Sequence, residues 1–367
     1  MQLERKPDFE KVLQRFEAWW HCEIIDRPLV SINVKEPYER QLKFPPEKKY
    51  ATLRDRWFDL EHQLQTMDVW TVRDPGETLV GVGETYPLFF PNLGPELTST
   101  VFGCELDFSE GTSWSKPICK NIREVLKLKP NLDTPYWNAI RKATDLSLEM
   151  GKGKWITALP DLHTNGDLLA SFRDPQELCL DLMDDPEGVR LACEYVTDFY
   201  QFMYDDLYKR IAAAGQPATT WINCLHAGRY YVSNCDFICM ISPKQFQEAI
   251  LPSIIRENEF LERNIFHLDG PGALKHLDAL LDVGKLDGVQ WVYGAGNGPS
   301  AKWAHVYQKV QAAGKCLQIL CDDVADAKAV AANIQPQGAW FCPGGSYTPQ
   351  EANDFIRWIE RWATGKK

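Results

Sequence analysis

The sequence predicts an α/β fold, a (β/α)8 TIM barrel with an elaborated N-terminal region. Segments typical of strands and of helices alternate at short spacing from residue 264 to the C-terminus, which is the pattern of parallel strands joined by helical crossovers. The 367 residues suffice for eight such units, which need about 250 residues or more. An open doubly wound sheet is the alternative, but no Gly-x-Gly-x-x-Gly turn follows an early strand.

Before residue 264, three strands are predicted, at residues 27–34, 154–160 and 219–225. Helix starts are marked by proline after an aspartate, at Asp174-Pro175 and Asp185-Pro186. Ser242 and Gln245 form a capping-box pattern that predicts a helix over residues 242–263.

From residue 264 onward, the alternation of predicted strands and helices is more regular. Strands are predicted at residues 264–269, 287–294, 316–321 and 338–342, each an apolar run beside a turn residue. Helices are predicted between and after them, at residues 273–284, 300–314, 324–334 and 348–365. The last helix has Thr348 as N-cap, Glu351 to complete a capping box and Gly365 beyond its end.

The N-terminal third, to about residue 115, is rich in proline, glycine and aromatic residues. Residues 86–96 and 102–114 are expected to form loops or short hairpins that cover the barrel mouth. We therefore expect a single domain over residues 1–367, with residues 1–115 as its elaboration.

The composition narrows the classes of partner. A formal net charge of −11 disfavours nucleic acid and an anionic membrane surface, although a local basic pocket remains compatible with it. The first twenty residues lack an apolar signal core, and no apolar run approaches membrane-helix length. With eleven cysteines and no Cys-x-x-Cys pair, the chain is expected in a reducing cytoplasm, with its cysteines mostly buried thiols.

In a barrel the active site lies at the carboxyl ends of the strands. The side chains there are Asp161 and His163; Asn223, Cys224 and His226; His267 and Asp269; Trp291 and Tyr293; Cys321 and Asp322; and Cys342. Asp161, His163, Asn223, His226, Trp291, Tyr293 and Asn297 are predicted to bind substrate or cofactor. For the lone histidines a loop hydrogen bond is the competing interpretation, and for Trp291 and Tyr293 it is core packing. Arg229 is either an anion clamp or one half of a surface salt bridge.

His267 and Asp269 are the predicted catalytic pair. Residues two apart on a strand point to the same side, so both can face one cavity. The turn Gly270-Pro271-Gly272 follows them and lets a ligand approach the backbone. Without a metal, Asp269 would orient the imidazole and His267 would act as a general acid or base; a structural pair that ties down the loop is the alternative.

The chain resembles the uroporphyrinogen decarboxylase superfamily, and within it the branch of cobamide-dependent methyltransferases. The resemblance rests on "AWWHCEIIDRPLV", "GRYYVSNCDFICMISPKQFQEAILPSI", "FHLDGPGALKHLDALL" and "DGVQWVYGAGNGP", and it extends from about Trp19 to the last helix. It implies an α/β barrel, a small-molecule substrate and two activities.

The first implied activity is methyl transfer between a small substrate and a corrinoid (cobalamin), with a corrinoid protein as partner. That branch binds zinc with His-x-Cys and a later Cys, and the zinc activates a thiol. Here His267 matches the histidine, Asp269 stands in place of the first cysteine, and Cys342, or else Cys321, would be the third ligand.

The second implied activity is decarboxylation of a tetrapyrrole or another carboxylated substrate. The decarboxylases carry an Arg-Gln-Ala-Gly-Arg-Tyr motif near the N-terminus, and no such motif lies in the first hundred residues here. A barrel that binds a corrinoid or tetrapyrrole without catalysis is the third interpretation.

Overall fold

The computed structural model describes residues 1–35, 43–71 and 82–365, and the predicted N-terminal elaboration lies partly outside them. The fold is mixed α/β, built on a seven-stranded sheet. In spatial order its strands are β2 (Val82–Gly83), β1 (Leu29–Ile32), β11 (Ala339–Pro343), β10 (Cys316–Cys321), β9 (Gly288–Val292), β8 (Arg263–Asp269) and β7 (Tyr230–Asn234).

The sheet is parallel except for β2, which pairs with β1 in the antiparallel sense. Strands β7 to β11 are neighbours in chain order, and β1 lies beside β11. All six parallel strands therefore end at one edge, called the carboxyl edge below, and begin at the opposite amino edge.

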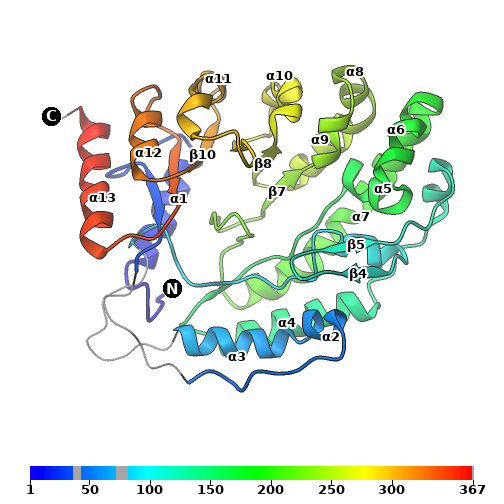
Figure 1. Cartoon of the computed structure of the whole chain (residues 1–367), viewed down its shortest axis with the longest axis horizontal. Coiled ribbons are helices and arrows are strands. Elements are labelled where there is room, and N and C mark those ends of the chain that lie inside the picture. The colour runs from blue at the N-terminus through cyan, green and yellow to red at the C-terminus, as the bar shows by residue number, and fades with distance from the viewer. Residues whose placement is uncertain (36–42, 72–81, 366–367) are drawn as a thin grey trace.

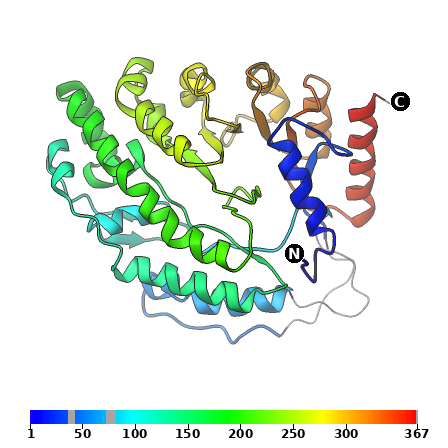
Figure 2. The same ribbon diagram turned by 180° about the vertical axis from the view of Figure 1, so that it is seen from behind.

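The helices follow the strands along the outside of the sheet. Figure 1 shows α9 to α13 as a row in chain order along the upper side, with α3 and α4 along the lower side, and Figure 2 shows the same arrangement from behind. The helices are α1 (Phe9–Trp19), α2 (Leu53–Phe58), α3 (Leu60–Thr71), α4 (Pro135–Met150), α5 (Asn165–Arg173), α6 (Pro175–Asp184), α7 (Pro186–Ala213), α8 (Pro243–Gln245), α9 (Leu251–Phe260), α10 (Leu277–Leu281), α11 (Ala304–Ala312), α12 (Val324–Ala331) and α13 (Pro349–Thr364). Shorter helical turns are η1 (Leu97–Phe102), η2 (Ile122–Lys127), η3 (Asp236–Met240), η4 (Phe246–Ile250), η5 (Pro271–His276) and η6 (Ser300–Trp303). Within the described residues, no helix is both long and apolar enough to cross a membrane.

The predicted C-terminal strands and helices are confirmed: the strand bounds differ from the predicted ones by at most two residues, and the α-helices are shorter than predicted. Asp174 and Asp185 cap α6 and α7, with proline at the first position of each, and the Ser242 capping box starts α8. The predicted strand at residues 154–160 contains only β6 (Ile156–Thr157), which pairs with β3 (Leu88–Phe89) in a separate two-stranded sheet. The expected hairpin in the N-terminal third is β4 (Leu106–Phe108) with β5 (Ser113–Ser115).

The predicted strand at residues 219–225 is wrong. That segment is a loop closed by one antiparallel bridge between Ala218 and His226. Cys224 and Leu225 within it are fully buried, and Ile222 is 3% exposed. The loop therefore has strand-like composition because it is buried, and the true strand of this region is β7, just after it.

Helix α13 provides a prediction for local stability. The Thr348 side chain accepts from the backbone N–H of Glu351, and the Glu351 carboxylate accepts from the backbone N–H of Thr348. Thr348→Ala should lower the free energy of unfolding by about 1 kcal/mol, because an orphan N–H at the helix start loses its acceptor. Urea unfolding of this variant measures the effect. Thr364→Ala, at the far end of the same helix, is the control, and equal losses in both would contradict the capping assignment.

Candidate functional site

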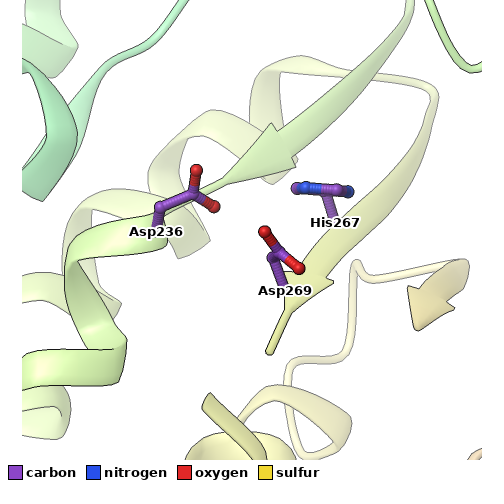
Figure 3. Close-up of side chains that lie close together, drawn as sticks. All are labelled: Asp236, His267 and Asp269. Carbon is purple, nitrogen blue, oxygen red and sulfur yellow. The ribbon is translucent and has the colours of Figure 1, made fainter. Parts of the chain in front are cut away.

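Asp236, His267 and Asp269 form a cluster at the carboxyl edge. One ligand-capable atom from each side chain lies within 4.8 Å of the others. Figure 3 shows His267 and Asp269 on the same side of β8, with Asp236 facing them from the start of η3. The prediction that His267 and Asp269 face the same space is confirmed.

The local sequence explains this placement. Strand alternation puts Phe266 and Leu268 into the core, and both are fully buried, while His267 and Asp269 lie on the other side. Gly270, with φ of +77°, ends the strand in a conformation that favours glycine. Strand β7 ends opposite His267, two residues before the end of β8, because Asn234 is the register partner of His267. The chain that leaves β7 therefore carries Asp236 to the cluster.

Side chains on the neighbouring strands β9 and β10 hold the imidazole of His267 in place. Its Nδ1 lies 2.5 Å from the Gln290 Oε1 on β9, and Gln290 Nε2 donates to Gln318 Oε1 on β10 at 2.5 Å. The Trp221 ring, from the 218–226 loop, meets the imidazole edge to face with ring centroids 4.9 Å apart. Within the described residues, Nε2 of His267 has no hydrogen-bond partner.

A second polar group adjoins the cluster through Asp236 and Asn234. His163 Nε2 lies 3.2 Å from Asp161 and 2.8 Å from the side-chain amide of Asn234, and its Nδ1 lies 3.6 Å from Asp167. Burial opposes protonation of this ring, but the charges of Asp161 and Asp167 outweigh it and raise the pKa of His163 to about 10. The surrounding carboxylates therefore favour the protonated form of His163.

Asp167 also organises the turn that carries Asp236. Its carboxylate accepts from the backbone N–H groups of Asp236 and Phe237 at 3.0 and 2.9 Å. Desolvation, followed by the negative charge of Asp167, raises the pKa of Asp236. Four aspartates, 161, 167, 236 and 269, thus gather around one imidazolium and one further histidine.

A pocket of about 570 Å³ opens beside the cluster, at the ends of β9 and β10. Val292 lines it and is the register partner of Asp269, so pocket and cluster are direct neighbours. Tyr293 and Asp322 line it too, and the Tyr293 hydroxyl donates to the Asp322 carboxylate. Tyr293 therefore lies where the sequence predicted a binding residue, whereas Asn297 lies in the loop beside the pocket, where its carbonyl accepts from the Trp303 indole.

Arg229 and His226 lie at the amino edge, because the strand of this region follows them. The Arg229 guanidinium pairs with Asp205 at 3.3 Å and lies over the Phe260 ring, 5.0 Å from its centroid. His226 Nδ1 contacts the Glu17 carboxylate at 3.0 Å. Their predicted position at the carboxyl edge is therefore wrong, and Arg229 forms the salt bridge that was the alternative interpretation.

Trp291 and Asn223 also differ from their predicted positions. Gln290 faces His267, so its neighbour Trp291 faces the helices, where it is fully buried against Trp303. Asn223 lies in the turn of the 218–226 loop with φ of +60°. Both positions favour a structural role over ligand contact.

The two cysteines predicted as metal ligands do not belong to the cluster. The Cys342 thiol accepts from Gln318 Nε2 at 3.6 Å, and burial raises the pKa of Cys342 to about 12. The Cys321 thiol donates to the Ile319 carbonyl at 3.7 Å, and burial raises its pKa as well. The structure places Asp236 in the position that the sequence gave to a cysteine.

Sequence reasoning missed Asp236, Asp167, Gln290 and Gln318. Asp236 follows the aromatic and β-branched run "YYVSN", so placing the strand there would have identified it as a strand-end residue. Gln290 and Gln318 interrupt apolar strands, and a buried amide needs partners, which is the signal that they carried.

Glu257, on α9, gives a pH-dependent prediction. Its buried carboxyl group accepts from Thr164 Oγ1 and from Asn165 Nδ2, and burial raises its pKa from 4.5 to about 7. A raised pKa in an acid means that the folded state holds the proton more tightly than the unfolded state does. The resulting stability is present below about pH 4.5 and is lost as the pH rises through about 7, a change of about 3 kcal/mol.

Glu257→Gln should remove this loss, so that the variant gains stability over the wild type as the pH rises. Urea unfolding of both proteins from mildly acidic to alkaline pH measures the difference. The exposed Glu248→Gln serves as control and should leave the profile unchanged. Parallel profiles for wild type and Glu257→Gln would contradict the prediction.

Fold and site together define an α/β chain with a histidine–carboxylate cluster and a pocket at the carboxyl edge of a mostly parallel sheet. No protein-family model matches the chain, and no curated protein matches it.

Proposed function

We propose that the chain is a (β/α)8 barrel enzyme that holds a divalent metal with Asp236, His267 and Asp269 and moves a methyl group between a small substrate and a corrinoid. The observation that carries the proposal is the convergence of these three side chains at the carboxyl ends of β7 and β8. The resemblance to cobamide-dependent methyltransferases supplies the reaction class.

Strand order supports a barrel over an open sheet. A doubly wound sheet reverses its order at a switch point, whereas here β7 to β11 run in sequence and β1 lies beside β11. An eight-stranded barrel needs two strands besides these six parallel ones, and we assign them to β6 and the start of the 218–226 loop. The Leu159 N–H donates to the Thr219 carbonyl at 3.0 Å, and the hydroxyls of Tyr86 and Thr219 lie 2.7 Å apart.

The cluster fits a divalent metal. Two carboxylates and one imidazole are ligands that zinc accepts, with zinc–oxygen distances of about 2.0–2.2 Å. Gln290 holds Nδ1 of His267, as outer-shell partners of metal-binding histidines do. Two hard oxygen ligands make the set less selective for zinc than a thiolate set would be.

A metal bound there supplies Lewis acidity that lowers the pKa of a hydroxyl or thiol on the substrate. The other groups position the substrate. The pocket beside Asp269 is large enough for a small molecule, and the Tyr293–Asp322 pair offers it a polar anchor. His163 places a fixed positive charge behind Asp236, which limits repulsion among the carboxylates.

The charge at this edge disfavours the decarboxylase alternative. A substrate with many carboxylates needs arginines. Residues 227–231, "AGRYY", are similar to the end of the Arg-Gln-Ala-Gly-Arg-Tyr motif of the decarboxylases, but their arginine, Arg229, pairs with Asp205 at the amino edge. The cluster presents aspartates to the same space instead. A polycarboxylated tetrapyrrole would be repelled there.

Incubation of the zinc-loaded protein with methylcobalamin and a series of thiol and alcohol acceptors tests the proposal. We expect the cobalt–carbon absorbance to decay with at least one acceptor, and the decay to disappear in Asp269→Asn. The matched control is Asp278→Asn, an exposed aspartate on α10. Bound corrinoid with no methyl loss would favour the non-enzymatic barrel, and carbon dioxide release from uroporphyrinogen would favour the decarboxylase.

A further inference from the structure

We infer that Gln290 and Gln318 form a polarised hydrogen-bond chain, anchored by the Ile222 carbonyl, that holds His267 as the tautomer protonated on Nδ1. Both glutamines are 4% exposed and lie side by side on β9 and β10, where they are register partners. Buried amides in such a position must satisfy both their donors and their acceptors.

The chain of contacts has a direction. Gln318 Nε2 donates to the Ile222 carbonyl at 3.3 Å and to the Cys342 thiol at 3.6 Å. Gln318 Oε1 then accepts from Gln290 Nε2, which leaves Gln290 Oε1 toward His267. An amide oxygen can only accept, so Nδ1 of His267 carries the proton.

Only one other arrangement satisfies the contacts between side chains, and the backbone excludes it. If both amides were turned over, Gln290 would donate to Nδ1 and His267 would be protonated on Nε2. The Gln318 oxygen would then face the Ile222 carbonyl, oxygen against oxygen, with no proton between them. Ile222 therefore decides the direction of the whole chain.

The 218–226 loop fixes this carbonyl in the interior. The Asn223 N–H donates to the Thr220 carbonyl at 3.0 Å, with Asn223 at φ of +60°, and the bridge between Ala218 and His226 closes the loop below. Thus a segment that contributes no strand to the sheet sets the protonation pattern at the carboxyl edge.

The consequence is that, in the neutral imidazole, Nε2 of His267 presents a lone pair toward Asp236 and Asp269. This is the form that binds a metal or accepts a proton. Gln290 and Gln318 are positioning residues, and their role does not depend on whether the methyl-transfer proposal is correct.

Two-bond nitrogen–proton correlation spectra of metal-free protein with isotope-labelled histidine test the inference, at mildly alkaline pH. The chain has seven histidines, and the His267 signals are those absent from His267→Asn. We expect the wild type to show the proton on Nδ1. A proton on Nε2 would overturn the inference, whatever the protein's activity.

Variants of the two glutamines test whether their hydrogen bonds, and not only their packing, set the tautomer of His267. Gln290→Leu should shift His267 toward the mixture of tautomers found in free imidazole, whereas Gln290→Glu keeps an acceptor and should retain the Nδ1 proton. Gln318→Leu frees Gln290 to turn and should also give a mixture. Gln308→Leu, on α11 away from the chain of contacts, is the control. An unchanged spectrum in Gln290→Leu would overturn the inference. If the leucine variants fail to fold, loss of the Nδ1 proton in Gln290→Glu would overturn it instead.

Discussion

Glu84→Ala should lower the free energy of unfolding by about 3–5 kcal/mol, because it leaves the buried guanidinium of Arg27 without its counter-charge. Glu84 is fully buried directly after β2. Its carboxylate accepts from Arg27 at 2.8 and 2.9 Å, from Arg15 at 3.1 Å and from the backbone N–H of Val30 at 2.6 Å. It therefore joins α1, β1 and the chain after β2 at the edge of the sheet.

Urea unfolding followed by circular dichroism measures this loss. Arg15 retains Asp26 as a partner, whereas among the described residues Arg27 retains only the Pro28 carbonyl, so Arg27 carries most of the penalty. Glu187→Ala, which breaks an exposed pair with Arg190, is the control and should lower the free energy of unfolding far less. A loss in Glu84→Ala as small as that of the control would show that the buried network does not stabilise the fold.

His267→Ala and Asp236→Asn should each weaken zinc binding by more than about 100-fold, because loss of a direct ligand exceeds the 10–100-fold effect of an outer-shell partner. Titration calorimetry on the apo-protein measures the affinity. Cys342→Ser distinguishes the two proposed ligand sets: the resemblance implied Cys342 beside His267 and Asp269, whereas the structure brings Asp236 close to them. We expect Cys342→Ser to bind zinc as the wild type does.

Asp278→Asn is again the control for the loss of one negative charge. Zinc binding that survives Asp236→Asn and fails in Cys342→Ser would restore the ligand set expected from the resemblance. Absence of binding in the wild type would remove the metal from the proposal and leave His267 as a general acid or base.

The strand predictions agree with the structure from β8 onward but not in the segment just before β7. From β8 onward, each strand is a short apolar run bounded by turn residues and each crossover helix begins within a few residues, so local signals suffice to place them. Before β8, residues 219–225 and 230–234 have similar composition, and both segments are buried. Burial gives the same apolar signal to an interior loop and to a strand, so composition could not distinguish them.

This single misplacement accounts for most errors at the candidate site. It moved His226 and Arg229 from the amino edge to the carboxyl edge, and it hid Asp236, which follows the true strand. The position of Trp291 was a separate error, because the prediction put it on the wrong face of its strand. Gln290 pairs with His267 and lies on the side of the cluster, so Trp291 points toward the helices.

By itself the sequence determined that His267 and Asp269 share one side of a strand and that Gly270 ends it, because strand alternation and glycine's access to positive φ are local properties. The tertiary structure alone decided what meets them. The register that pairs Asn234 with His267 brings in Asp236, and the register that pairs His267 with Gln290 links the imidazole to Gln318 and Ile222. Strand register depends on contacts between segments that are distant in the chain. The periodicity of one segment therefore does not predict which residues of the neighbouring strand lie opposite it.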